Sequence, residues 1–286
     1  PSATDGHYFR GLVLMAVCLA FFTVNALLIK YLGTNQHVGT WPLVLLRGII
    51  GLAFVLIWYG HRAGLRVTRV FTRPALVARG LLGSLGLVCY YWTIPRLGAG
   101  VATLVSNTYV VFGAVFATCF LLREKLSHAQ LLWLLVSLAG VGLLMNVRMG
   151  LDVSFAVALL GAVSAGMVIV IIRYLHQTDE ATPTIFASQC IYAILAAAPL
   201  AFPELVRLST TQLGWAILAS FMATFGQLTM THSFRYLSVS TGGALHLSIP
   251  VWVSLGGFFL FDEHLAWLQI VGAGLVLLGC LKAIRR

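Results

Sequence analysis

The chain has 286 residues, of which 60% are hydrophobic and only 9% charged, with a net charge of +10 and a mean hydropathy of +0.96. Soluble domains carry about 25% charged residues, and a water-soluble globule of this size cannot cover so much apolar surface. The composition therefore excludes a soluble enzyme, a disordered chain and a secreted disulfide scaffold. It indicates a polytopic, all-α membrane protein.

Long uncharged stretches divide the chain into candidate spans. A helix that crosses a bilayer needs about 20 mostly apolar residues. The stretches between charges predict ten transmembrane helices, at 8–31, 40–60, 74–97, 98–122, 128–147, 153–176, 182–202, 210–236, 238–261 and 265–284. The connections are short, and no nucleotide-binding motif of the form G-x-x-x-x-G-K-[ST] occurs. We therefore expect no transport driven by nucleotide hydrolysis.

The distribution of basic residues predicts the orientation. Ten spans place both termini on one side, and that side receives thirteen Lys and Arg residues against four on the other. Arg79, near the start of the third span, counts among the thirteen, and Arg47 lies inside a span. By the positive-inside rule both termini are cytoplasmic, in a multi-pass protein of the inner membrane. The net charge then reflects topology and attraction to anionic lipid, not a nucleic-acid-binding surface.

The second half of the sequence repeats the first. The segment 29–32 (Ile-Lys-Tyr-Leu) ends the first span, and the segment 172–175 (Ile-Arg-Tyr-Leu) ends the sixth. Further matches follow in the same order: Pro42/Pro183, Ser84/Thr224, Gly86/Gly226, Thr93/Ser233, Leu97/Leu237, Glu124/Glu263, Gln130/Gln269 and Gly140/Gly279. Similar composition alone is the alternative explanation.

An odd number of spans per half makes the second half upside down in the membrane. We therefore predict two inverted five-helix repeats, 1–150 and 151–286, around a central cavity. Inverted repeats are typical of secondary transporters, which bind substrate near the bilayer midplane.

Several short motifs resemble those of a known family. They are Pro42 with Arg47, the run from Arg79 and Gly80 through Tyr91 to Leu97 and Gly98, the turns 122–126 and 261–265, and the segment 248–251 (Ser-Ile-Pro-Val). Over essentially the whole chain their order resembles the ten-span, EamA-type branch of the drug/metabolite transporter superfamily. The first half departs from the family pattern, because the segment 108–111 (Thr-Tyr-Val-Val) lies where the family often has a proline. The resemblance implies export of small metabolites, commonly amino acids including aromatic ones, through a central cavity.

Ionisable residues inside a span are costly and mark functional sites by default. All eight carboxylates lie at predicted helix ends or loops, so we expect no pump for lipophilic cations, which would need a buried carboxylate. Arg47 lies about two turns into the second span. It is compatible with snorkelling to the headgroups, with a polar partner, or with binding a substrate carboxylate.

His246 is the second ionisable candidate. Pro250 has no N–H, so the carbonyl of His246 loses its helical donor near the predicted midplane. This pattern predicts a residue that lines the cavity, and the alternative is a kinked packing helix whose histidine bonds a hydroxyl. The repeat pairs Ser106 with His246, and Pro250, Gly242 and Gly243 are candidate hinge positions.

The other candidates for substrate contact are amides, hydroxyls and aromatic residues within spans. The amides bind substrate or hydrogen-bond neighbouring helices. The tyrosine pair near the end of the third span lines a cavity or belongs to the aromatic belt. The deeper aromatic residues favour a cavity. In chain order these candidates are Asn25, Tyr90, Tyr91, Asn107, Tyr109, Gln227, Ser248 and Trp252.

The leading interpretation is a secondary transporter, not an enzyme, that exports small metabolites, above all amino acids, by alternating access. We expect no cofactor and no metal, and the five cysteines show no pairing pattern. The expected partners are a small-molecule substrate and the lipid bilayer, not nucleic acid, and a monomer suffices. The alternatives are another cargo (nucleotide-like, vitamin-like or a drug), a sensor or assembly subunit, and an intramembrane enzyme, for which no motif was found.

Overall fold

The computed structural model describes residues 3–60, 65–97, 99–119, 122, 127–144, 153–261 and 266–284, and the regular structure in this part of the chain is all α-helical. Seven helical segments are long and apolar enough to cross a membrane. Three shorter apolar helices, Pro74–Tyr90, His128–Leu144 and Trp267–Ala283, lie where the other three spans were predicted. The prediction of an all-α membrane protein is confirmed.

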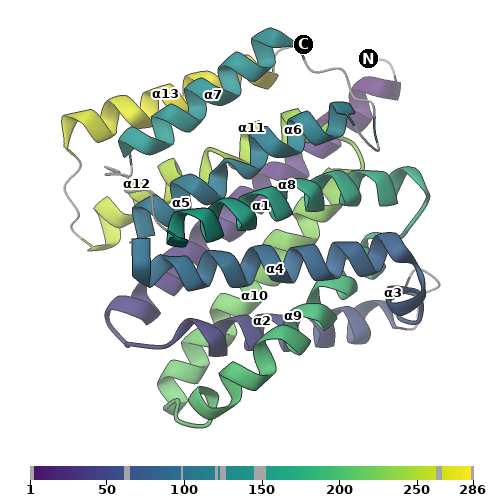
Figure 1. Ribbon diagram of the computed structural model, residues 1–286, viewed down its shortest axis with the longest axis vertical. Coiled ribbons are helices and arrows are strands. Elements are labelled where there is room, and N and C mark those ends of the chain that lie inside the picture. Colours follow the sequence, from purple (N-terminus) through teal and green to yellow (C-terminus); the bar gives the residue numbers. More distant parts are fainter. Residues whose placement is uncertain are drawn as a thin grey trace. The chain divides into compact units, whose positions relative to one another are not determined.

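The helices follow the chain in a simple order (Figure 1). Those of the first half are α1 (Ala3–Thr34), α2 (Thr40–Tyr59), α3 (Arg69–Thr72), α4 (Pro74–Leu97), α5 (Ala99–Asn107), α6 (Tyr109–Cys119) and α7 (His128–Leu144). Those of the second half are α8 (Val153–Gln177), α9 (Thr182–Leu205), α10 (Thr210–Ser233), α11 (Val239–His246), α12 (Ile249–Phe261) and α13 (Trp267–Ile284). Large apolar side chains such as Ile57 and Phe259 are exposed, as expected for helices that face lipid.

Two predicted spans are not single helices. The span at 98–122 consists of α5 and α6, and the span at 238–261 consists of α11 and α12. A kink near Pro250 was among the expectations for the second of these spans, and no interruption was predicted for the first. The breaks lie at Thr108 and at Leu247–Ser248, and local hydroxyl groups take part in both.

The chain forms two compact units, each containing segments from both halves of the sequence. Unit 1 comprises Pro1–Ser84 and Leu175–Arg235, and unit 2 comprises Leu85–Tyr174 and Tyr236–Arg286. In unit 1, α1 packs on α10 and α2 packs on α9. In unit 2, α7 packs on α13 and α6 on α11, and Figure 1 shows α7 and α13 running side by side.

Equivalent spans of the two halves pack directly on each other. The pairs α2 and α9, α6 and α11, and α7 and α13 each join a span of the first half to its counterpart in the second. Small residues allow the closest of these approaches. A Cβ added at Gly140 of α7 would lie 2.7 Å from the carbonyl oxygen of Gly272 in α13, and Ser137 Oγ donates to the carbonyl of Val276 at 3.3 Å.

Some motif residues lie outside the described part of the chain. They include Gly98 and most of the two turn motifs, with Glu124 and Glu263. The backbone of Tyr91 is helical, but its side chain is also outside the described set.

Candidate functional site

The sequence-predicted site residues fall into two groups, one in each unit. Unit 1 holds Asn25, Arg47 and Gln227, and unit 2 holds the candidates of the broken helices.

In unit 2, the break between α11 and α12 follows His246 directly. The amide of Ser248 donates to the carbonyl of Leu245 at 3.0 Å, and Ser248 Oγ donates to the same oxygen at 2.7 Å. Pro250 is the second residue of α12, a position where a helix needs no N–H donor. The proline therefore starts a new helix, and the chain turns at Leu247 and Ser248.

An equivalent break occurs in the first half without any proline. The amide of Thr108 donates to the carbonyl of Val105 at 3.1 Å, and Thr108 Oγ1 donates to it at 2.6 Å. The amides of Val111 and Phe112 then donate to the carbonyl of Thr108, as those of Val251 and Trp252 do to Ser248. Thr108 and Ser248 are separated by the offset that relates Ser106 to His246, so the two breaks correspond residue for residue.

A direct contact joins the two broken helices. Tyr109 Oη and His246 Nδ1 form a hydrogen bond of 2.6 Å, and their rings meet edge to face with centroids 5.8 Å apart. Gly243 makes this approach possible, because a Cβ added there would lie 2.6 Å from Val110 Cγ1. The tyrosine and the histidine, both predicted site residues, are thus brought together where the backbone of both helices is interrupted.

The other candidates of unit 2 have varied surroundings. Tyr90 Oη and Thr103 Oγ1 form a hydrogen bond of 3.1 Å between α4 and α5. Trp252 Nε1 donates to Ser248 Oγ at 3.3 Å, although 45% of the tryptophan side chain is exposed. The contact attaches the indole to the break.

The remaining candidates lie on the helices next to the breaks. Ser106 and Asn107 are half-buried in the last turn of α5, immediately before Thr108. Gly242 is buried one residue before the packing position of Gly243. For Tyr91 only the backbone is described, and it lies in α4.

In unit 1, the polar candidates contact other helices. Arg47 Nη2 donates to Gln227 Oε1 at 2.9 Å, and its guanidinium carbon lies 5.9 Å from the centroid of the Phe22 ring. Asn25 Nδ2 donates to the carbonyl of Ala219 at 2.7 Å and so links α1 to α10. Of the three alternatives for Arg47, the structure shows the polar partner.

Arg79 is the residue that the sequence interpretation misplaced. It was counted among interfacial cations because it lies five residues after the start of its span, but its side chain is fully buried in unit 1. The three guanidinium nitrogens have no hydrogen-bond partner among the described residues. The side chain lies along its own helix, because a Cβ added at Gly83 would be 2.5 Å from Arg79 Nη1. The sequence feature that could have indicated this orientation is Gly83, one turn after Arg79, where the absence of a side chain leaves room for the guanidinium.

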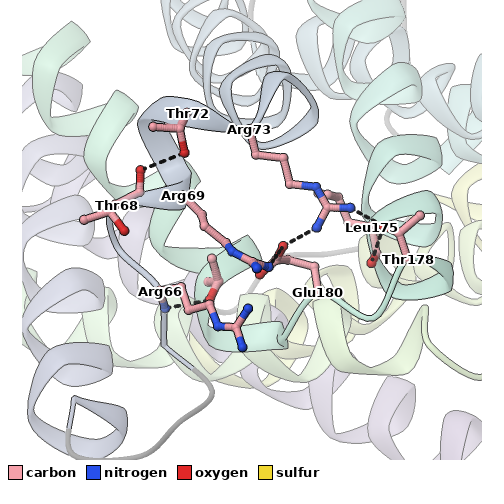
Figure 2. Close-up of polar contacts among 9 residues, drawn as sticks. Arg66, Thr68, Arg69, Thr72, Arg73, Leu175, Thr178 and Glu180 are labelled. Carbon is pink, nitrogen blue, oxygen red and sulfur yellow. Dashed lines mark hydrogen bonds and ion pairs between the residues drawn. The ribbon is translucent and has the colours of Figure 1, made fainter.

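A second charged cluster attaches α3 to the turn between α8 and α9 (Figure 2). The side chain of Glu180 is only 2% exposed and accepts hydrogen bonds from Arg69 Nη1, at 3.3 Å, and from Arg73 Nη1. Arg73 Nη2 also donates to Thr178 Oγ1 at 2.6 Å. Glu180 lies in a loop, as expected, but it is a buried carboxylate with two arginine partners. Within the described residues, no His, Cys, Asp and Glu cluster suits a metal ion.

The sequence and fold are similar to those of known transport proteins. The model of the EamA-like transporter family matches residues 9–146 and again 154–284. The pseudopaline exporter CntI of Pseudomonas aeruginosa strain UCBPP-PA14 is 27% identical over 280 residues, covering 96% of this chain and 95% of that protein. The S-adenosylmethionine uptake transporter of Rickettsia prowazekii is 22% identical over 263 residues, covering 90% and 86%.

A solved structure shares the fold. It is titled "Crystal structure of protein", and it has a TM-score of 0.74 at 18% identity, with 96% of each chain covered.

Proposed function

Because the chain belongs to the EamA-like transporter family, we propose that it is a secondary transporter of the inner membrane that exports amino acids, including aromatic and hydrophobic ones. It is not an enzyme in this proposal, and both termini are cytoplasmic. The observation that carries the proposal is the pair of matched helix breaks at Thr108 and Ser248, joined by the hydrogen bond between Tyr109 and His246.

Broken helices suit a zwitterionic substrate. At each break one helix presents carbonyl groups at its C-terminal end and the next presents amide groups at its N-terminal end. The ends of α5 and α11 favour an ammonium group, and the starts of α6 and α12 favour a carboxylate. Tyr109, His246 and Trp252 add aromatic surface beside these backbone groups, which suits an apolar side chain. Ser106, Asn107 and Ser248 supply further polar contacts in the proposal.

The proposed mechanism is alternating access. The substrate binds at the breaks, in a cavity between the two inverted repeats near the midplane. Rocking of the helices then opens the cavity to the opposite side, with Gly242, Gly243 and Pro250 as hinges. The driving force in this proposal is either the substrate's concentration gradient or proton exchange, and flux measured with and without a proton gradient distinguishes the two.

A different cargo is the second candidate, because the buried Arg79 and the half-buried Arg47 favour anionic groups. The similar proteins are named for pseudopaline and S-adenosylmethionine, and for opposite directions of transport. Both compounds therefore belong in the test panel beside amino acids, a nucleotide and a vitamin.

The test is flux in liposomes that contain the purified protein. Labelled members of the panel are loaded, and their efflux is measured with and without a proton gradient. The proposal predicts efflux of amino acids, with Asn25→Ala lowering the rate per folded molecule. Efflux of a nucleotide or a drug without efflux of any amino acid would contradict the substrate assignment and leave a transporter of another metabolite class.

A further inference from the structure

Arg79 is an ionised side chain held in the interior without compensation. Its side chain has no exposed surface, and Nε, Nη1 and Nη2 all lack hydrogen-bond partners among the described residues. A buried cation is costly unless a counter-charge or hydrogen-bond acceptors surround it. The described residues supply no hydrogen-bond partner, so an anion from outside the chain would relieve this cost.

Other arginines of the described chain have the acceptors that Arg79 lacks. Arg47 bonds to Gln227, and Arg69 and Arg73 bond to Glu180. Arg96 Nη1 donates to the carbonyl of Trp92 at 2.8 Å, and its guanidinium carbon lies 3.7 Å from the centroid of the Trp92 ring. Glu180 is thus engaged by other residues, and no carboxylate of the described chain bonds to Arg79.

The guanidinium lies deep along its helix. Arg79 is five residues after Pro74, where α4 begins. Its side chain extends to the level of Gly83, which is nine residues after Pro74. At 1.5 Å per residue this level is about 13 Å from the start of a helix about 36 Å long. Snorkelling to the nearer headgroups would direct the side chain the opposite way, so the observed orientation favours a partner inside the bundle.

The surroundings of the guanidinium are positive and polar. A Cβ added at Gly83 would lie 3.5 Å from Gln189 Oε1 of α9, which places this amide next to the guanidinium. Arg47 belongs to α2, which packs on the same helix: a Cβ added at the adjacent Gly48 would lie 3.2 Å from the carbonyl oxygen of Cys190 in α9. Among the described residues, the half-buried Arg47 bonds to the neutral Gln227, and no ion pair is formed by Arg47 or Arg79.

We propose that Arg79, with Arg47 of the same unit, forms a separate site in unit 1 that binds the carboxylate of the transported molecule at a different stage of the transport cycle from the breaks of unit 2. The inference rests on the proposed function and deepens it, because it makes a carboxylate group a requirement for recognition. A guanidinium presents parallel N–H groups that match the two oxygens of a carboxylate. Since the side chain is enclosed in this conformation, binding requires α4 and α9 to separate.

The experiment measures ligand-induced thermal stabilisation of the purified full chain. The probes are L-phenylalanine, L-phenylalaninamide, succinate and phenyl phosphate, which separate carboxylate, amide and phosphate recognition. The variants are Arg79→Gln and Arg79→Lys, with Arg96→Gln as the control that removes an exposed arginine from the same helix. Gly83→Ala keeps the charge and displaces the guanidinium.

The expected result has two parts. Without ligand, Arg79→Gln has a higher melting temperature than the wild type, because an uncompensated charge has been removed. With L-phenylalanine, Arg79→Gln loses about 10- to 100-fold in affinity, Arg79→Lys and Gly83→Ala lose less, and Arg96→Gln is unchanged. L-phenylalaninamide does not stabilise the wild type.

Other outcomes separate this inference from the proposed function. Arg79-dependent binding of succinate without binding of phenylalanine would support the carboxylate site and contradict the amino-acid assignment. Equal binding of acid and amide, binding of phenyl phosphate only, no stabilisation by any carboxylate, or wild-type affinity in Arg79→Gln would overturn the inference. If Arg79→Gln melts below the wild type without ligand, the cation serves the fold and the inference also fails.

Discussion

Gln227 gives Arg47 a neutral acceptor where a carboxylate would complete an ion pair. The hydrogen bond of 2.9 Å satisfies one N–H of the guanidinium and leaves its positive charge uncompensated. Hydrogen bonds to charged groups contribute about 1.5–3 kcal/mol, and opposite charges in the interior attract more strongly than the same charges in water. At the scale of single residues, the proposed carboxylate site in unit 1 therefore depends on Gln227 being neutral.

Replacing Gln227 with glutamate tests whether the charge of Arg47 acts on the substrate. In Gln227→Glu the new carboxylate pairs with Arg47, so we expect a higher melting temperature without ligand and a KM for amino acids raised about 10-fold, because it competes with the substrate. Gln130→Glu is the matched control, because Gln130 is half-buried at the start of α7 and its Oε1 accepts from the amide of Ser127. Transport assays in liposomes measure the KM, and an unchanged KM in a folded Gln227→Glu protein would show that Arg47 does not act on the substrate.

Sequence reasoning at this scale succeeded where a residue type alone determines the need for a partner. Asn25, Arg47 and His246 were expected to require polar contacts inside the membrane, and each one has them. Arg79 was not foreseen, because its position near a helix end is equally compatible with a side chain that reaches the headgroups. The direction of a long side chain depends on neighbouring helices, which the linear sequence does not specify.

The broken helices are the principal feature at the scale of elements. Both breaks use a hydroxyl that bonds the carbonyl three residues earlier, and only the second is followed by a proline. Val110 occupies the position equivalent to Pro250, as the second residue of its helix. Proline is tolerated there because that amide has no partner within the helix.

A proline scan therefore distinguishes a break from a continuous helix. We expect Val110→Pro to fold with a melting temperature close to that of the wild type. Val111→Pro removes an amide that donates to Thr108 at 3.0 Å, and it should cost about 3 kcal/mol or more. Thermal unfolding in detergent measures both variants. Equal and severe destabilisation by the two prolines would mean that α5 and α6 behave as one helix.

The sequence could predict the second break but not the first. Pro250 removes a backbone donor, and this effect is visible in the sequence. Thr108 breaks its helix through a side-chain hydrogen bond that a threonine inside an ordinary helix also forms, as Thr118 does with Ala114. Tertiary packing decides between these outcomes, here through the contact of Gly243 with Val110.

The attachment of α3 to the turn before α9 gives a second prediction at this scale. Glu180→Gln removes the carboxylate that holds Arg69 and Arg73, and we expect a destabilisation of about 1–3 kcal/mol, since both arginines are partly exposed to solvent. Asp179→Asn is the control, because Asp179 is exposed and its φ of 54° suits asparagine. Thermal unfolding should separate the two variants, and equal melting temperatures would contradict a stabilising role for Glu180.

At the scale of the whole molecule, packing follows the repeat found in the sequence. Three pairs of equivalent spans pack on each other, and each compact unit includes segments from both halves. The number and order of spans were predictable because bilayer thickness fixes helix length and charge limits hydrophobic stretches. The assignment of helices to units was not, because it depends on contacts between residues far apart in the chain.

The orientation can be measured by thiol labelling. After Cys119, the exposed native cysteine among the five, is changed to serine, new cysteines are placed at the exposed residues Gln177 and Arg207. With cytoplasmic termini, Arg207→Cys reacts with a membrane-impermeant maleimide in intact cells, whereas Gln177→Cys reacts only after permeabilisation. The reverse pattern would overturn the orientation inferred from the basic residues.

The central claim is that the Tyr109–His246 contact at the matched breaks belongs to an amino-acid transport site. Its most direct test is counterflow of labelled L-phenylalanine in liposomes containing the wild type, His246→Ala or His128→Ala, the last being an exposed histidine at the start of α7. We expect counterflow with the wild type and His128→Ala, and at least about a 10-fold slower rate with folded His246→Ala. Absence of counterflow in the wild type, or an unchanged rate in His246→Ala, would contradict it.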